Sequence, residues 1–285
     1  MHAKDKFIAF IDVLGFTNLV QQAEADGGDF SRALELAAAL GDRGEMDIYK
    51  DLGPTTCPES TYVAKDLDFQ LTQISDCVVV SAEVSPAGLV NLISHCSGIA
   101  IRLLQKGALC RGFITRGAIH HEPGQFIGTG YMNAYKKEAE VAFLRADEAE
   151  KGTPFIQIDE VVLDYAANHT DRCVQDQLSR ATRSDGTYRA IYPFGVFKNI
   201  PGAMMVPGFF DPAKFLDNVR ESIGYRQRDL KKFQDAETAA TDDRAKRKIR
   251  HYSAGIEDVI EHLRGKERRA EQMLATGNIP WGSII

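Results

Sequence analysis

The chain of 285 residues has no uninterrupted apolar run near 18 residues, the length that a membrane-spanning helix needs. Its first residues, Met1–Lys6, are too polar for a signal peptide. The five cysteines form no CxxC pair, so a zinc site is not indicated. Cys77, Cys96 and Cys110 stand in apolar contexts and are expected to be reduced core residues. These absences predict a cytoplasmic protein that does not enter a membrane.

Basic charge is also in deficit. The sequence has 34 Lys and Arg against 40 Asp and Glu, a formal net charge of −6, so non-specific binding to nucleic acid is not favoured. There is no internal repeat and no clear linker. The apolar fraction of 44% and the charged fraction of 26% are ordinary for a soluble globular protein, and the length allows a sizeable core.

The first informative stretch is Lys6–Phe16, an apolar run broken by a single acid. Phe7–Ile11 predicts a buried strand, and Asp12 stands at its end, where an unpaired carboxylate would be costly. Gly15 is the flexible point before a helix that starts near Thr17. The backbone amides of such a strand-to-helix turn can hold phosphate oxygens. Asp12 therefore either caps the helix or binds a cation.

A second acid occupies a similar place in Asp68–Ser81, which predicts two strands joined at Ser75–Asp76. Asp76 lies at the tip of this hairpin, between two otherwise apolar strands. Beside the end of the first strand, Asp12 and Asp76 would form a two-carboxylate site for Mg²⁺ or Mn²⁺, with water and phosphates as the other ligands. Two such ions can serve an in-line displacement at phosphorus.

The remaining periodicity predicts an α+β fold with a split βαβ, ferredoxin-like sheet flanked by helices. A helix-rich, charged C-terminal part, Asp211–Thr276, leads us to divide the chain into a domain of residues 1–205 and a helical extension of residues 206–285 packed on it. The other predicted elements are a helix over Asn18–Leu40 broken at Gly27–Gly28, a long loop over Gly41–Lys65 holding Tyr49 and Tyr62, a helix over Ser85–Lys106, a strand over Ala108–His120, a turn at His120–Glu122, a short strand at Phe126–Ile127, a helix over Tyr131–Glu150 and a strand over Phe155–Ile158.

Two arginines, Arg111 and Arg116, interrupt the predicted strand Ala108–His120. A guanidinium in a core strand needs a carboxylate, a phosphate or solvent, and its planar fork suits a phosphate or the carbonyl-rich edge of a base. Each arginine is therefore either a substrate contact or one half of an ion pair. Lys136 and Lys137, near the start of the next helix, indicate either an anionic partner or a solvated face.

Three segments resemble motifs of the class III nucleotidyl cyclases. Lys6–Thr17 resembles the first metal-binding segment, F-x-D-h-x-G-F-T, where h is apolar; Thr72–Asp76 resembles the hairpin K-x-h-G-D; and Arg111–Gly117 resembles the core strand R-h-G-h-x-T-G. Their order and spacing agree over roughly Lys6–Ala149, about half of the chain.

The departures from the adenine-specific members are informative. Thr72 stands where those enzymes carry a lysine, and Phe126 stands where they carry an acid if Asn133 is the catalytic asparagine. Lys137 then replaces the transition-state arginine. The chain is more similar to the pyrimidine cyclases of the bacterial anti-phage system Pycsar, which share an opening like FIDhLGF and an h-S-D hairpin. Arg111, Gly112 and Arg116 match a further motif of that family, and Gly128–Glu138 matches its later G-x-x-h-x-A-Y-x-x-E segment loosely.

The resemblance implies a uridylate cyclase that converts UTP to 3′,5′-cyclic UMP and pyrophosphate with two Mn²⁺ or Mg²⁺ ions. It implies a homodimer, and a cyclic product that acts on a separate effector protein. A cytidylate cyclase that uses CTP and an inactive nucleotide-sensing homologue remain open as alternatives. A diguanylate-forming enzyme is not favoured, because the hairpin at Ser75–Asp76 has no GGDEF-like run. The implied site residues are Asp12 and Asp76 as catalytic residues, Asp12, Val13 and Asp76 as metal ligands, and Phe10, Gly15, Phe16, Thr17, Arg111 and Arg116 as substrate contacts.

Overall fold

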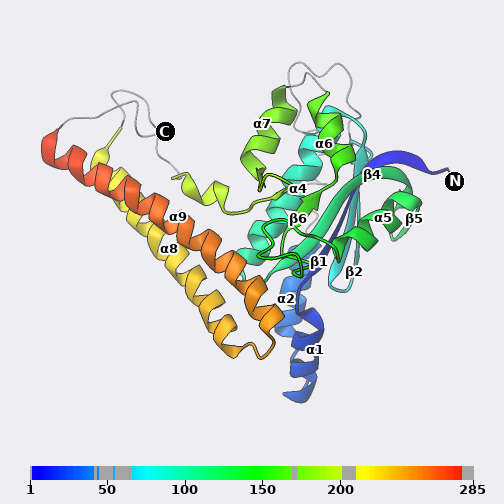
Figure 1. Cartoon of the computed structure of the whole chain (residues 1–285), viewed down its shortest axis with the longest axis horizontal. Helices are drawn as coiled ribbons and strands as arrows, with labels where there is room; N and C mark the ends of the chain where they lie inside the picture. Colours follow the sequence, from blue (N-terminus) through cyan, green and yellow to red (C-terminus); the bar gives the residue numbers. More distant parts are fainter. Residues whose placement is uncertain are drawn as a thin grey trace. The chain divides into compact units, whose positions relative to one another are not determined.

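The computed structural model describes residues 2–41, 44, 54, 64, 66–168, 172–200 and 210–277. The chain forms two compact units, Met1–Pro193 and Phe194–Ile285 (Figure 1). The predicted domain boundary between residues 205 and 206 lies outside the described residues, as do Tyr49, Tyr62 and most of the predicted loop around them.

A mixed sheet forms the centre of the first unit. Its first four strands are ordered β2-β3-β1-β4 with antiparallel neighbours throughout, which is the split βαβ arrangement of a ferredoxin-like fold. The order continues with β6, parallel to β4, then β8 and β7, while β5 pairs with the end of β4. The α+β prediction is therefore confirmed. The strands are β1 (Lys4–Val13), β2 (Gln70–Ile74), β3 (Cys77–Glu83), β4 (Cys110–Glu122), β5 (Gln125–Ile127), β6 (Ile156–Ile158), β7 (Thr182–Ser184) and β8 (Arg189–Ile191).

The larger core lies on the face of the sheet that α2, α4, α6 and α7 cover (Figure 1). In the described parts of this unit, the helices besides α5 include α1 (Phe16–Ala25), α2 (Ser31–Leu40), α4 (Pro86–Gln105), α6 (Glu160–Ala167) and α7 (Arg172–Ala181). Helix α4 has the length and composition of a membrane span, but 72% of its most apolar window is buried inside the protein. Its N-terminus is capped by the Ser85 hydroxyl, which accepts from the Gly88 N–H at 3.0 Å. Helix α4 is thus a core helix.

The prediction of reduced core cysteines is confirmed for Cys96 and Cys110, which are free and buried; Cys77 is also free but is only partly buried. Cys173 in α7 is disulfide-bonded.

The opposite face carries α5 (Thr129–Glu138), which lies across β4 and β1. Two glycines allow this close approach: a Cβ at Gly130 would meet the side chain of Ile8 at 2.4 Å and the backbone of Gly117 at 3.0 Å. The predicted helix over Tyr131–Glu150 was too long. The helix ends because the Gln157 side-chain oxygen accepts the N–H groups of Ala142 and Phe143, at 2.9 and 3.2 Å, and so takes the donors that a longer helix would use.

The predicted turn at His120–Glu122 was wrong, because β4 continues through these residues and pairs with β5. His121 is buried, with its two ring nitrogens 2.8 Å from the Ser81 hydroxyl and 3.1 Å from the Thr72 hydroxyl. Burial, and then the nearby positive charge of Lys6, lower the pKa of His121 to about 4. The histidine is therefore a neutral structural residue that joins three strands.

We expect His121→Leu to lower the free energy of unfolding by about 2–4 kcal/mol at pH 7.5, because two buried hydroxyls lose their partner. The stability that a neutral His121 supplies is complete above its unfolded pKa of 6.5 and is lost as the pH falls toward about 4. The difference in unfolding free energy between wild type and His121→Leu, measured by urea unfolding, should therefore be smaller by about 1–2 kcal/mol at pH 5 than at pH 7.5. His120→Leu on the same strand is the control. If this difference in unfolding free energy were the same at both pH values, His121 would not be a neutral buried residue.

The second unit consists mainly of a helical hairpin, α8 (Pro212–Ala239) and α9 (Asp243–Thr276), with a short 3-10 helix, η1 (Gly195–Lys198). The Asp211 and Asp242 carboxylates cap the two long helices by accepting backbone N–H groups of the first turn. The predicted helix-rich C-terminal part is thus confirmed. Its core residues recur at three- and four-residue intervals and include Phe215, Val219, Ile223, Phe233, Tyr252, Ile256, Val259 and Leu263.

Candidate functional site

The two predicted aspartates meet at one end of the sheet. Asp12 is the penultimate residue of β1, and Asp76 lies in the two-residue turn between β2 and β3, where Ser75 has a φ of +54°. The Val13 N–H donates to the Asp76 carbonyl at 3.0 Å, which fastens the hairpin tip to the end of β1. Both carboxylates are half-buried. The structure therefore brings Asp12, Val13 and Asp76 together, as the two sequence segments indicated.

A third carboxylate, Glu138, joins this end of the sheet. It is the last residue of α5, is only 5% exposed, and forms an ion pair with Arg111 on β4. Sequence reasoning missed its role. The signal was present, because Gly130, Ala134 and Glu138 recur every four residues and so share the buried side of the helix.

The surroundings of Asp12 disfavour its ionised carboxylate. The pKa of Asp12 is raised to about 7, chiefly by burial, then by the negative charges of Glu138 and Asp76, while Arg111 opposes the shift. Burial and the same carboxylates also raise the pKa of the neighbouring Cys77 thiol to about 11. A cation beside Asp12 would relieve this repulsion.

These residues fit a hard divalent cation. Over residues 2–41, 66–168, 172–200 and 210–277, no three His, Cys, Asp or Glu side chains are arranged to enclose a metal. Two carboxylates suffice for Mg²⁺ or Mn²⁺, because these ions keep several water and phosphate ligands. The donor set is all oxygen and anionic, which suits such ions and not zinc.

A helix N-terminus follows the Asp12 strand directly. Gly15, with a φ of +80°, turns the chain into α1, and no side chain caps the first amides of that helix. Phe16 packs its ring into the large core, and Thr17 is exposed. Of the predicted substrate contacts, Gly15, Phe16 and Thr17 can thus offer backbone N–H groups to an anion.

Phe10 lies on the same face of β1 as Asp12 but is almost buried, at 4% exposed. Its ring contacts those of Tyr131 and Tyr135 edge to face, with centroids 6.3 and 5.3 Å apart. Tyr135 is 56% exposed, so the aromatic surface available beside the aspartates belongs to Tyr135 more than to Phe10.

The two arginines of β4 lie on opposite faces of the sheet. Arg111 is opposite Asp12 in the register. Arg116 is opposite Phe7, whose ring belongs to the larger core on the other face of the sheet. Arg116 donates to Asp5 at 2.7 and 2.9 Å and lies 5.8 Å from the ring centre of Tyr165. The structure therefore does not bring Arg116 to the aspartates. Both arginines form the ion pairs that the sequence left open as the alternative.

Of the positions that differ from adenine-specific enzymes, Thr72 is buried and Phe126 is half-buried. Thr72 is 6% exposed and bonded to His121, and the Phe126 ring contacts those of His121 and Tyr131 with centroids 5.6 and 4.5 Å apart. Asn133 donates to the Thr115 hydroxyl at 3.2 Å.

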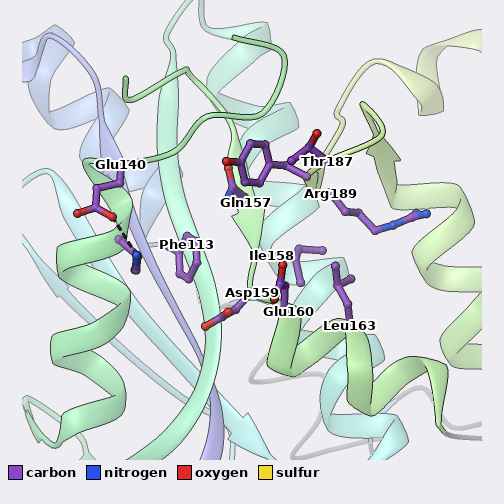
Figure 2. Close-up of a pocket in the computed structure, with 11 residues that line it drawn as sticks. Phe113, Glu140, Gln157, Ile158, Asp159, Glu160, Leu163, Thr187 and Arg189 are labelled. Atoms are coloured by element: carbon purple, nitrogen blue, oxygen red, sulfur yellow. Dashed lines mark hydrogen bonds and ion pairs between the residues drawn. The ribbon is translucent and has the colours of Figure 1, made fainter. Parts of the chain in front are cut away.

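A separate pocket opens beside α5, where Lys137 pairs with Glu140 at 2.9 Å (Figure 2). It contains neither Asp12 nor Asp76.

No family model matches the chain, and no curated protein matches it. Among solved structures, the chain is similar to a class III adenylyl cyclase-like ATP-binding protein from Pseudomonas aeruginosa, with 12% identity and a TM-score of 0.36. The match covers 57% of this chain and 35% of that protein, so it spans about a third of the length of that structure.

Proposed function

We propose that this chain is a nucleotidyl cyclase that forms a 3′,5′-cyclic nucleotide and pyrophosphate from a nucleoside triphosphate. The observation that carries the proposal is the meeting of Asp12 and Asp76, held by the hydrogen bond between Val13 and Asp76, directly before the uncapped N-terminus of α1. Each of the three sequence motifs that resemble class III cyclases contributes one charged residue to this end of the sheet, namely Asp12, Asp76 and Arg111.

Each part of the site has a task in that reaction. Asp12 and Asp76 would hold two Mg²⁺ or Mn²⁺ ions, which supply a lowered pKa for the ribose 3′-hydroxyl and neutralise charge at the α-phosphate. The first amides of α1 would hold the β- and γ-phosphates. Arg111 and Glu138 orient the end of α5 against β4 through their ion pair. Positioning and electrostatics of this kind supply most of the catalysis of phosphoryl transfer.

The finer proposal is a uridylate cyclase that works as a homodimer and makes cUMP as a second messenger in anti-phage defence. Its support is the sequence resemblance to the Pycsar pyrimidine cyclases. Thr72 and Phe126 add to this support, because neither side chain can supply the charged hydrogen bonds with which an adenine-reading pocket works. CTP is the alternative substrate. Because Arg111 is paired with Glu138, we do not propose that Arg111 recognises the base.

The test is to incubate the purified protein with UTP, CTP, ATP and GTP, each with Mn²⁺ or Mg²⁺, and to identify products by mass spectrometry. We expect cUMP to be the most abundant cyclic product, as the resemblance to pyrimidine cyclases implies. A preference for ATP or GTP would refute the pyrimidine assignment. Binding of a nucleotide without turnover under all these conditions would identify a sensor and refute the cyclase.

A further inference from the structure

Helix α5 divides its face of the sheet into two flanks. Glu138 and Ala134 face the sheet, Tyr135 lies against Phe10 on the flank of Asp12, and Asn133 reaches Thr115 on the other flank. The pocket that Lys137 lines is on the flank of Asn133. The pocket and the aspartate pair of one chain are therefore separated by the helix.

The pocket encloses about 320 Å³, near the lower end of the range of about 300–1,000 Å³ that small-molecule sites occupy. Figure 2 shows Glu140, which continues the chain beyond α5, on one side of it and Thr187, before β8, on the other. The nearly buried ring of Phe113 and the half-buried Tyr188 give it aromatic surface. A flat ring of small size fits this combination of volume and lining.

A fixed hydrogen-bond donor enters the pocket from Gln157, which is 8% exposed. Its side-chain oxygen is committed to the N–H groups of Ala142 and Phe143, so the amide cannot flip without losing both bonds. Within the described part of the chain, the NH₂ group of Gln157 makes no hydrogen bond. Because Gln157 lines the pocket, this NH₂ group is a donor that a molecule in the pocket can use.

A fixed acceptor lies two residues away, at Asp159. One carboxylate oxygen of Asp159 accepts the Thr115 hydroxyl at 2.6 Å, and Thr115 also accepts from Asn133. The other oxygen has no hydrogen-bond donor among the residues that the structure describes. Gln157 and Asp159 both line the pocket, so the pocket offers one donor and one acceptor besides its aromatic side chains.

We propose that this pocket binds a nucleobase. Every base has a hydrogen-bond donor next to an acceptor on one edge, as in N3–H and O4 of uracil, and a flat ring that packs on aromatic side chains. The Gln157 amide donates to the acceptor and the free oxygen of Asp159 accepts from the donor. The base belongs either to a free nucleotide that regulates the protein or to a substrate whose phosphates lie at the aspartates of a second copy of the chain, because α5 separates the pocket from the aspartates of its own chain. Binding of a base here does not depend on turnover at Asp12 and Asp76, and only the second source, the substrate, rests on the proposed function.

The test measures the affinity of uridine, cytidine, adenosine and guanosine by calorimetry in the inactive Asp12→Asn protein, with ribose as a blank. At least one nucleoside should bind, and ribose should not. Gln157→Glu keeps the oxygen that Ala142 and Phe143 use but replaces the donor, and Asp159→Asn keeps an oxygen for Thr115 but replaces the acceptor. Each should weaken nucleoside binding by on the order of ten- to hundredfold. Tyr135→Leu, on the other flank of α5, should leave it unchanged.

Absence of nucleoside binding at millimolar concentration, or equal binding by the parent and both pocket variants, would overturn the proposal. Because the assay uses an inactive protein, it stands even if the wild type makes no cyclic nucleotide. The two sources of the base are then told apart in the wild-type background. A substrate base makes Gln157→Glu raise the KM for the nucleotide, whereas a free regulator makes added nucleoside change the rate in wild type but not in Gln157→Glu.

Discussion

Asp12→Asn should lower cyclase activity by a factor of at least about 10³ and at the same time make the metal-free protein more stable. The loss of activity follows because the amide keeps the shape of the side chain but removes a charge that would hold the metal ions. The gain in stability follows from the three carboxylates that gather at this end of the sheet, Asp12, Asp76 and Glu138. An amide at position 12 removes the repulsion between this side chain and the carboxylates of Asp76 and Glu138.

The pH dependence of that gain has a definite sign. In the folded protein the Asp12 carboxyl keeps its proton up to about pH 7, whereas in the unfolded chain it releases it near pH 3.8. The stability of the wild type therefore falls as the pH rises through this window, and the amide does not titrate. Because Asp12 is partly exposed, solvent screening leaves a gain of about 1–2 kcal/mol for Asp12→Asn at pH 8, which should shrink toward pH 5.

Urea unfolding of the two proteins at pH 5 and pH 8, with and without Mg²⁺, measures this effect. Magnesium should stabilise the wild type at pH 8 and have little effect on Asp12→Asn. Asp76→Asn should show the same loss of activity, and Asp5→Asn, at the other end of β1, is the control for a charge change without a metal site. Wild-type turnover in either site variant would show that the two-carboxylate site is wrong.

Arg111→Met should lower the free energy of unfolding by about 3–5 kcal/mol, because it leaves Glu138 charged, buried and without its partner next to Asp12. The double variant Arg111→Met with Glu138→Gln should recover most of that loss, since no buried charge is then left unpaired. Arg116→Met is the matched control, because its pair with Asp5 is more exposed and should contribute at most about 1 kcal/mol.

The same variants decide what Arg111 does for the substrate. If the ion pair positions α5, Arg111→Met should lower the turnover of UTP, CTP, ATP and GTP by similar factors, and the double variant should remain impaired. A loss confined to UTP would show instead that Arg111 leaves Glu138 and reads the base. Equal stability of Arg111→Met and the wild type would contradict the buried pair.

The strand order and the meeting of Asp12 with Asp76 could be predicted from sequence, because both depend on local signals. Phe7–Ile11 and Cys77–Val80 are apolar runs of strand length, and Ser75–Asp76 has the polar character of a turn. Once the β-α-β-β-α-β order is recognised, the ferredoxin-like arrangement places the end of the first strand beside that hairpin.

Other features depended on partners that no local pattern shows. The end of α5 is decided by the Gln157 side chain, which comes from a later strand and lies 15 residues beyond Ala142, whose N–H it accepts. His121 looked like a turn residue because its acceptors and donors, Ser81 and Thr72, are on strands that precede it by 40 and 49 residues. The separation of Arg111 from Arg116, by contrast, was predictable, since residues an odd number apart on a strand face opposite ways.

The position of β1 in the sheet also bears on how the protein reaches its fold. This strand is the first of the sheet in the chain but lies in the middle of it, with β3 on one edge and β4 on the other. A ribosome adds about 5–20 residues per second, so the edge of β1 that pairs with β4 remains unpaired for roughly 5–20 s, until Cys110–Glu122 has been synthesised. Over that interval an apolar strand has an open edge for pairing with other chains. Overproduction is therefore expected to cause aggregation during synthesis, and slower translation or a chaperone that covers Phe7–Ile11 should raise the yield of folded protein.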